Sequence, residues 1–363
     1  MIKPIYVPVI SIHSNVRDYT AHFQDDVSFL QGFDRFPQRF FVIDENVWKL
    51  HGTGCLAAIP EEERMLFAAT EERKGLDSVM QIYDRLMERS AKKNMTLISI
   101  GGGIVQDVTG FVASTLYRGL NWIFVPTTLL AQADSCIGSK TSLNYKRFKN
   151  LLGTFYPPNE LHIHAPFLKT LNEADFLSGL GEVVKLHLMG GREKTAALIA
   201  DLTAVLSREP DALMRAIRSS LAIKLSYMEG DEFDTGRRNL LNFGHCFGHA
   251  LETVSNYDIP HGQAVVVGMI FANLAARRRS WLSSATSEQL LASLLLKALS
   301  VPMRKEYFAS DAILEAMKQD KKRVGSGLVM VMMKEDYSFE KAVDFSEAEL
   351  QYGIAELKGV LNV

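Results

Sequence analysis

The sequence predicts an α/β N-terminal domain with a parallel sheet over residues 1–170, followed by a mainly α-helical C-terminal domain over residues 171–363. A chain of 363 residues has room for two domains at about 150 residues each. Its first half alternates strand-like apolar runs with helical stretches, which is typical of a parallel sheet covered by helices. From about residue 171, apolar residues recur instead with the helical period of about 3.6 residues. This change of period places the boundary near residue 170.

In the first half, each expected element has its own pattern. The apolar runs at residues 39–43, 96–100 and 121–125 are expected to form buried strands. The amphipathic stretch at residues 76–89 is expected to form a helix between the first two strands. Two prolines and an asparagine at residues 157–159 mark a turn.

In the second half, helices are expected at residues 211–228, 264–276 and 287–299, and a late strand at residues 328–332. The segment 264–276 is the most apolar of the chain, but it is well short of the roughly 20 residues that cross a bilayer. We therefore expect a buried helix there and no contact with a membrane.

The composition excludes several classes of protein. Lys and Arg number 40 against 42 Asp and Glu, so the net charge is −2, which argues against a protein that neutralises nucleic-acid phosphates. Cys55, Cys136 and Cys246 are widely spaced and form no CxxC pair, so neither a disulfide framework nor a cysteine zinc site is expected. The N-terminus lacks the pattern of a signal peptide. A reducing, cytoplasmic location fits these features best.

A glycine-rich turn is the first candidate site. Gly101, Gly102 and Gly103 follow the strand at 96–100 and precede a helix. Glycines allow the backbone to approach a phosphate, and a helix N-terminus offers unpaired N–H groups. Asp44 and its neighbours end the strand at 39–43, where a ribose could be bound at the carboxyl edge of a sheet. These features favour a Rossmann-like dinucleotide site, with a ligand-free tight turn as the alternative.

Three histidines form the second candidate site. His245 and His249 are four residues apart and would share one face of a helix, and His261 follows in what is expected to be a loop after Pro260. A protease HExxH motif is excluded, because Cys246 stands where the glutamate would be. The histidines could form a metal site or a proton-transfer site, or each could have a structural role.

Charged residues in apolar surroundings extend this second site. Glu182 and Lys185 would share a helix face, either as an ordinary ion pair or as part of a ligand set. Further cations could form a cradle for a phosphorylated and carboxylated substrate, or each could lie on the surface. These cations are Arg118, Lys140, Lys149, Lys185, Lys224 and Arg238.

Five stretches of the chain form a recognisable set. They are GGGIVQDVTGFVAST at residues 101–115, YRG at 117–119, VPTTLLAQADS at 125–135, KN at 149–150 and NFGHCFGH at 242–249. Together they closely resemble 3-dehydroquinate synthase and its sugar phosphate cyclase relatives. The resemblance runs nearly continuously from about Arg39 to Met269, and residues 320–322 are similar to a late lysine motif of the family.

The resemblance implies roles for particular residues. It implies a zinc ion, with Co²⁺ as an alternative, on Glu182, His245 and His261, and a catalytic role for His249. For NAD it implies Asp44, Asn46, Glu71, Lys74, Gly102, Gly103, Asp107, Thr127, Thr128 and Thr170. For catalysis on the substrate it implies Lys140, Lys185, Arg238 and Asn242, and for substrate binding Arg118, Asp134, Lys149, Asn150, Lys224 and one or both of Lys321 and Lys322. It also implies a homodimer.

The chemistry implied by the resemblance is a cycle without net oxidation. NAD transiently oxidises a substrate hydroxyl, phosphate is eliminated, hydride returns, and an intramolecular aldol reaction closes the carbocycle. The expected substrate is 3-deoxy-D-arabino-heptulosonate 7-phosphate, as in the shikimate pathway to aromatic amino acids. Gln106, Ser139 and residues 145–148 depart from the family pattern. Sedoheptulose 7-phosphate, glucose 6-phosphate or an aminated analogue therefore remain alternative substrates.

Two other classes of protein remain open. A dehydrogenase of the glycerol or iron-containing alcohol type would share the two-domain organisation and the glycine-rich turn, but a small neutral alcohol needs no cationic cradle. A non-catalytic NAD-binding protein would be expected to have lost some of the metal or proton-transfer residues, and all of them are present here.

Overall fold

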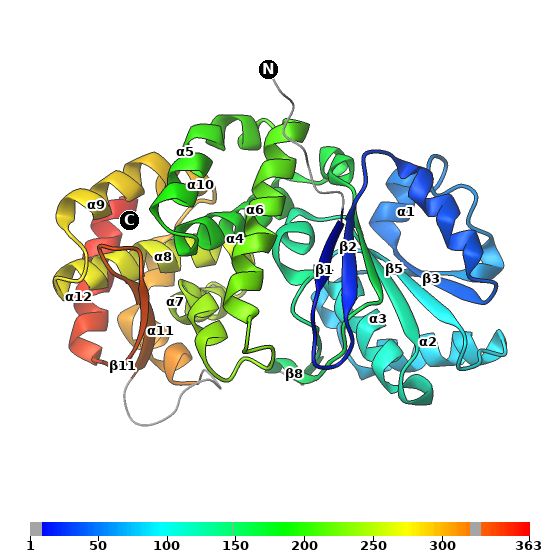
Figure 1. Cartoon of the computed structure of the whole chain (residues 1–363). Helices are drawn as coiled ribbons and strands as arrows, with labels where there is room; N and C mark the ends of the chain where they lie inside the picture. Colours follow the sequence, from blue (N-terminus) through cyan, green and yellow to red (C-terminus); the bar gives the residue numbers. More distant parts are fainter. Residues whose placement is uncertain (1–8, 147, 320–327) are drawn as a thin grey trace, which may run out of the picture. The chain divides into compact units, whose positions relative to one another are not determined.

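The computed structural model describes residues 9–146, 148–319 and 328–363. The chain divides into two compact units, Met1–Leu171 and Asn172–Val363 (Figure 1). Lys321 and Lys322, which the family resemblance implies for substrate binding, lie outside the described residues. In the described parts of the chain, no helix is long and apolar enough to span a membrane. The three cysteines are free, as their spacing predicts.

The N-terminal unit contains a seven-stranded sheet in the order β1-β2-β9-β6-β5-β3-β4 (Figure 1). All neighbouring strands run parallel except β1 and β2, which confirms the predicted parallel sheet. All six residues of β5 are buried, as expected of a strand covered on both faces. The strands are β1 Val9–Ile12, β2 Tyr19–Phe23, β3 Arg39–Asp44, β4 Arg64–Phe67, β5 Thr96–Gly101, β6 Asn121–Pro126 and β9 Glu160–Ile163.

The order of the strands creates a switch point between β3 and β5. From β3 the chain continues to β4 on one side, and from β5 it continues to β6 on the other. Open parallel sheets bind ligands at the carboxyl ends of the strands that flank such a point. Ile43 pairs with Ile100, so the ends of β3 and β5 lie side by side and bring Asp44 next to the glycine-rich turn.

Helices and a separate hairpin complete this unit. The helices are α1 Glu45–His51, α2 Leu76–Glu88 and α3 Gly103–Thr115. The hairpin consists of β7 Lys140–Tyr145 and β8 Phe148–Phe155, and β7 packs against α3. A hydrophobic core that includes Phe33, Phe41 and Ile98 fixes the positions of the strand ends.

The C-terminal unit is mainly helical, as predicted. Its central helix α8 is buried from Gly262 to Ala276, and α4 and α7 both pack against it (Figure 1). The helices are α4 Glu173–Met189, α5 Arg192–Leu206, α6 Pro210–Met228, α7 His245–Val254, α8 His261–Arg278, α9 Ser284–Leu290, α10 Leu296–Ala298, α11 Ser310–Lys318 and α12 Glu347–Leu361. A hairpin of β10 Leu328–Met333 and β11 Phe339–Phe345 accompanies them.

Two expectations for this unit need correction. His261 is not in a loop: it is the first residue of α8, because Pro260 needs no N–H partner and its carbonyl accepts the first helical bonds, from Gln263 and Ala264. The helix expected at residues 287–299 is interrupted by a π-helical turn at Leu291–Leu295.

Candidate active site

A close contact between two helices creates the candidate metal centre. A Cβ atom on Gly181 of α4 would lie 2.1 Å from the carbonyl oxygen of Gly262 in α8, and one on Gly262 would lie 1.7 Å from that of Ser178. Only glycine allows the two backbones to approach so closely. Glu182 follows Gly181 and His261 precedes Gly262, so this contact places the carboxylate beside the imidazole.

Glu182, His245 and His261 point their ligand atoms at a common position. Oε1 of Glu182 lies 3.1 Å from Nε2 of His261 and 3.3 Å from Nε2 of His245. The ligand atoms of the three side chains lie within 4.8 Å of one another. Glu182 is only 1% exposed, so its charge requires nearby compensation.

The outer nitrogens of both imidazoles are held by acceptors. Nδ1 of His245 donates to the carbonyl of Phe243 at 3.1 Å, and Nδ1 of His261 donates to Oε2 of Glu252 at 3.1 Å. This arrangement leaves both Nε2 lone pairs for a metal ion, as is typical of histidine ligands. One carboxylate and two imidazoles suit a catalytic zinc site with open positions. The residues present therefore fit a divalent ion.

Lys185 and the carboxylates determine the charges of this cluster. Nζ of Lys185 lies 2.5 Å from Oε2 of Glu182. Burial would raise the pKa of Glu182, but Lys185 and the imidazoles outweigh it and hold that pKa well below its ordinary value. Burial and Lys185 lower the pKa of His245. Burial also opposes the charged form of His261, but hydrogen bonds to Glu182 and Glu252 raise its pKa to about 10 in the metal-free protein.

His249 lies beside this cluster rather than at its centre. Its ring centroid is 5.2 Å from that of His245 and 5.7 Å from that of His261. Together with Glu252 and His261 it forms a second group of side chains with metal-ligand geometry. The sequence interpretation missed Glu252, although it lies three residues after His249 and seven after His245, on the same face of α7.

The glycine-rich turn of the N-terminal unit forms an open helix N-terminus. Helix α3 begins at Gly103 without a side-chain cap, so its first amides can face an anion. A Cβ atom on Gly102 would lie 2.9 Å from a methyl group of Thr128, and the Thr127 amide donates to Gly101. Asp44 caps α1 through the amide of Asn46. These predicted NAD residues therefore gather at the carboxyl edge of the sheet.

Three more predicted NAD residues follow β4 or lie on α3. Nζ of Lys74 lies 2.5 Å from Oδ2 of Asp107 and 2.6 Å from Oδ1 of Asn150. Burial raises the pKa of Asp107, and Lys74 and Ser142 oppose this shift. Glu71 accepts from the side chain of Asn144. Lys74, which is expected to bind NAD, is therefore hydrogen-bonded to Asn150, which is expected to bind the substrate.

Thr170 lies apart from the other predicted NAD residues. Its hydroxyl contacts His51, the last residue of α1, at 3.0 Å, whereas Asp44 caps the first turn of that helix.

The predicted substrate residues differ in their burial. Lys185, Lys224 and Arg238 are 3%, 8% and 4% exposed, so these three are not surface cations. The guanidinium of Arg238 donates to the carbonyl of Glu232. Asn242 donates to the carbonyl of Asn239 at 2.8 Å. The remaining members are half-buried or exposed: Arg118, Asp134, Lys140, Lys149 and Asn150.

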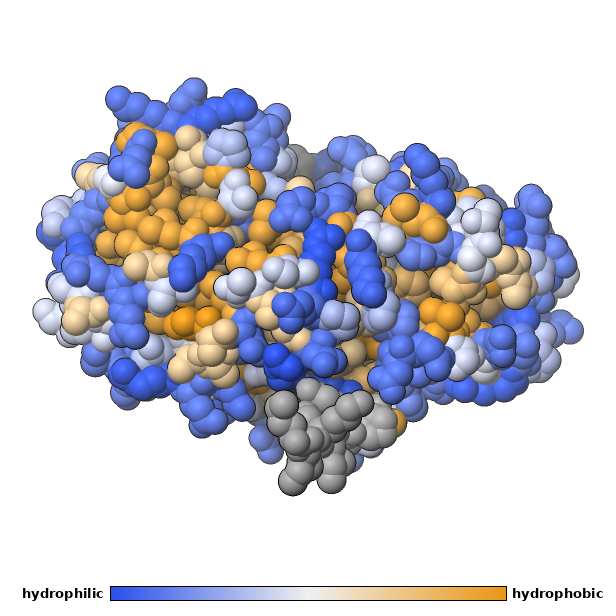
Figure 2. All heavy atoms as spheres, turned by 90° about the horizontal axis from the view of Figure 1, so that it is seen from above, coloured by the Kyte–Doolittle hydropathy of each residue, from blue (hydrophilic) through white to orange (hydrophobic). Residues whose placement is uncertain are grey.

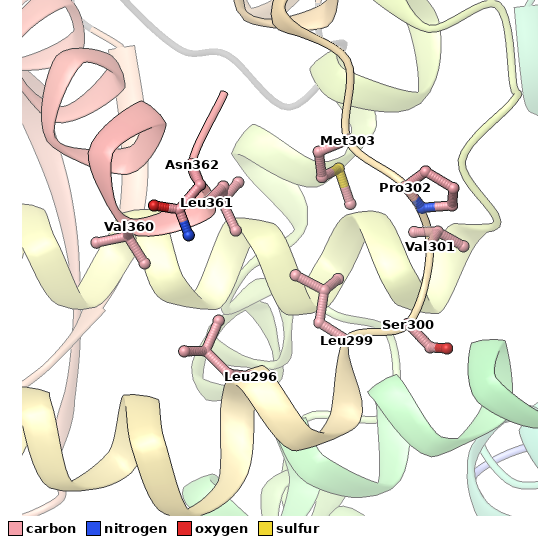
Figure 3. Close-up of a pocket in the computed structure, with 9 residues that line it drawn as sticks. All are labelled: Leu296, Leu299, Ser300, Val301, Pro302, Met303, Val360, Leu361 and Asn362. Carbon is pink, nitrogen blue, oxygen red and sulfur yellow. The ribbon is translucent and has the colours of Figure 1, made fainter.

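A pocket elsewhere in the C-terminal unit has a different character. It encloses about 430 Å³ between the end of α12 and residues 296–303, and Figure 3 shows mainly aliphatic side chains around it. Figure 2 shows that hydrophobic atoms also gather over a broad area of this unit. None of the predicted site residues lines the pocket, and it contains no ionisable side chain for chemistry on a phosphorylated substrate.

Comparison with known proteins identifies the family. The models for the N-terminal and C-terminal parts of 3-dehydroquinate synthase match residues 64–178 and 179–323. The 3-dehydroquinate synthase of Clostridium tetani is 36% identical over 88% of this chain and 85% of its own length. The chain belongs to the 3-dehydroquinate synthase family. It is accordingly an enzyme of the lyase class, a cyclase, as the resemblance in its motifs predicts.

Further relatives agree with this family over nearly the whole chain. The 3-dehydroquinate synthase of Dictyoglomus turgidum is 35% identical over 96% of this chain and 93% of its own length. The fold is that of sugar phosphate cyclases. A 2-deoxy-scyllo-inosose synthase solved with carbaglucose-6-phosphate, NAD⁺ and Co²⁺ has a TM-score of 0.85 at 23% identity, covering 96% of this chain and 99% of that one.

Two other solved structures show how widely this fold is shared. The 2-epi-5-epi-valiolone synthase of Streptomyces hygroscopicus, with NAD⁺ and Zn²⁺ bound, has a TM-score of 0.84 at 24% identity, covering 96% of this chain and 99% of that one. A probable glycerol dehydrogenase from Sinorhizobium meliloti has a TM-score of 0.65 at 12% identity, covering 94% and 97%. The fold alone therefore does not separate members of the 3-dehydroquinate synthase family from dehydrogenases.

Proposed function

We propose that this enzyme converts 3-deoxy-D-arabino-heptulosonate 7-phosphate into 3-dehydroquinate and inorganic phosphate, using NAD and a divalent metal ion, Zn²⁺ or Co²⁺. The observation that carries the proposal is the convergence of Glu182, His245 and His261 with both Nε2 atoms turned inward. The relatives named 3-dehydroquinate synthase support the same reaction. A place in the shikimate pathway and a cytoplasmic location follow as predictions.

The cofactors would supply chemistry that the side chains lack. A divalent ion on Glu182, His245 and His261 would supply Lewis acidity to a substrate oxygen, and NAD would supply reversible hydride transfer. The glycine-rich turn and the open end of α3 would bind the pyrophosphate. Asp44, at the switch point of the sheet, would bind a ribose hydroxyl of the same dinucleotide.

The buried cations would hold the anionic substrate and exclude water. Arg238 presents a planar guanidinium, which suits a carboxylate. Lys185 and Lys224 are buried point charges that would stabilise negative charge developing during elimination, because a dry site strengthens such interactions. Lys140 and Asn150 on the β7–β8 hairpin would bind the phosphate.

His249 would move a proton at the edge of this site. Its ring lies against both ligand imidazoles and outside the group that includes Glu182, which suits an exchange of a proton with a substrate oxygen held beside the metal centre. Because NAD would supply hydride transfer in both directions, one inorganic phosphate would be released per turnover without accumulation of NADH.

The decisive experiment measures phosphate release by the purified, Zn²⁺-loaded enzyme with NAD⁺. The keto acid phosphate and sedoheptulose 7-phosphate are offered in parallel, and the products are identified by mass spectrometry. Release from the keto acid alone, with 3-dehydroquinate as the product, is the expected result. Release from sedoheptulose 7-phosphate alone would overturn the proposed substrate, and NADH accumulation with glycerol would overturn the reaction class.

A neutral sugar phosphate is the second candidate substrate. It is retained because the chain departs from the family pattern beside a predicted substrate residue: Gln106 exchanges two 2.7 Å hydrogen bonds with Ser135, which adjoins Asp134. The predicted homodimer is tested separately by sedimentation of the same preparation.

A further inference from the structure

Asn144, near the end of β7, bonds to two separate loops of the N-terminal unit. Its Nδ2 donates to Oε1 of Glu71 at 2.8 Å and to the Glu71 carbonyl at 3.1 Å. Its Oδ1 accepts from the backbone amide of Asn150 at 2.9 Å. Its own backbone amide donates to the carbonyl of Lys74 at 2.7 Å. One residue thus joins the loop after β4 to the β7–β8 hairpin.

Lys74 and Ser142 connect the same two segments a second time. Nζ of Lys74 donates to Oδ1 of Asn150 at 2.6 Å, and Oγ of Ser142 lies 2.9 Å from the same oxygen. Both groups also lie beside Oδ2 of Asp107, Lys74 at 2.5 Å and Ser142 at 3.0 Å, and the one hydroxyl proton of Ser142 is shared between the two oxygens. Because Oδ1 of Asn150 accepts from the ammonium of Lys74, the Nδ2 group of Asn150 is turned away from that ammonium.

The backbone of Asn150 is also part of this network. Its φ angle is +51°, in the left-handed region that asparagine adopts more readily than most residues other than glycine. The bond from its amide to Asn144 holds the hairpin in that conformation. Lys149, its neighbour, reaches to 3.9 Å from Oε1 of Glu71, the same carboxylate oxygen that Asn144 binds.

We propose that Asn144 is a positioning residue that couples the binding of NAD to the binding of the phosphate group. This inference rests on the proposed function and on the roles that the family resemblance implies, which are NAD binding for Glu71 and Lys74 and substrate binding for Lys149 and Asn150. One carboxamide holds Glu71 with its donor end and Asn150 with its acceptor end, so ordering one loop orders the other. The coupling must be reciprocal: each ligand tightens the other by the same factor.

The test measures this factor with NAD⁺ and inorganic phosphate as probes. Calorimetric titration of the metal-loaded enzyme with NAD⁺, without and with saturating phosphate, gives the coupling factor, and the reverse titration must give the same value. The wild type should show tighter NAD⁺ binding when phosphate is present. N144A removes both ends of the carboxamide, and the factor should fall to about 1 while each ligand alone binds up to about tenfold more weakly.

Three further variants separate coupling from a loss of folding. N144D keeps an oxygen for the Asn150 amide but places a carboxylate against Glu71. It should retain phosphate affinity and lose NAD⁺ affinity and coupling. The matched control is N121A, because Asn121 is an exposed residue at the start of β6 whose side chain bonds only to that of Asn159 among the contacts described. Thermal unfolding of each variant verifies the fold, and S142A weakens the network should both Asn144 variants fail to fold.

The outcomes distinguish this inference from the proposed function. A wild-type coupling factor of 1, or a factor in N144A equal to that in N121A, overturns the role of Asn144 while phosphate release from the keto acid still stands. A wild type that binds no NAD⁺ overturns both. A factor lost in N144A or S142A and kept in N121A establishes the coupling.

Discussion

Replacing Glu252 by glutamine should weaken metal binding while leaving the helical unit folded. Oε2 of Glu252 lies 3.1 Å from Nδ1 of His261, and the glutamate side chain is 10% exposed. Glutamine retains an oxygen of the same reach but removes the charge that makes this hydrogen bond strong. Loss of such a partner behind a ligand histidine costs about 10- to 100-fold in metal affinity. This range corresponds to about 1.4–2.8 kcal/mol.

The assay is competition between the metal-free enzyme and a chromophoric chelator for Zn²⁺. Visible absorption of Co²⁺ provides a second readout, because its intensity reports the coordination geometry of the bound ion. E288Q is the matched control: Glu288 is an exposed residue of α9 outside the metal cluster, and the change removes the same charge. Thermal unfolding without metal verifies that both variants are folded at the assay temperature, and E252Q should melt lower than E288Q because the Glu252 charge stabilises protonated His261 in the metal-free protein.

Equal Zn²⁺ affinities for E252Q and E288Q would refute the reasoning, because the contact with His261 would then contribute nothing to the ligand set. A shared fall in affinity in both variants would refute it equally, since the effect would come from net charge rather than from the hydrogen bond to the imidazole.

Three further predictions follow from the geometry. G181A should lower the free energy of unfolding of the C-terminal unit by about 3 kcal/mol or more in chemical denaturation, because the added Cβ would lie 2.1 Å from the Gly262 carbonyl. G359A, whose added Cβ meets no atom within 4 Å, should leave the free energy of unfolding unchanged or raise it. The imidazole of His162 and the guanidinium of Arg35 lower the pKa of Glu160 to about 2. The ionised carboxylate therefore stabilises the fold above about pH 4.5, and this stabilisation is lost as the pH falls toward 2. In E160Q the free energy of unfolding should fall less steeply between those pH values than in the wild type, and an unchanged slope would contradict this. R238A should reduce kcat/KM for the carboxylated substrate at least about tenfold more than for sedoheptulose 7-phosphate, and equal losses would count against a carboxylate role.

The strands at the centre of the sheet could be predicted because burial on both faces leaves a continuous apolar run. The runs at residues 39–43, 96–100 and 121–125 became β3, β5 and β6 within one residue at each end. The outer strands β1, β2 and β4 have only four or five residues with mixed burial, so their periodicity is too short to detect. Identification of central strands was therefore sufficient to place the glycine-rich turn, but not to count the strands.

The candidate site was predictable where its geometry is local. His245 and His249 share a face of α7 because their spacing matches the helical repeat, and the same argument extends to Glu252. Asn144 could not be found in this way, because its partners Glu71 and Lys74 lie about 70 residues earlier in the chain. Only the folding of the β7–β8 hairpin against the loop after β4 brings them together.

The glycines next to the metal-ligand residues determine how closely the ligand atoms approach one another. Gly181 directly precedes Glu182, and Gly262 directly follows His261. Because the backbones of α4 and α8 touch at these two glycines, the side chains one residue away are brought within hydrogen-bond distance, 3.1 Å. A larger residue at either position would separate the helices and the ligand atoms with them. The distance between carboxylate and imidazole is thus fixed by residues that have no side chain, which is why a substitution at Gly181 should remove metal binding as effectively as one at Glu182.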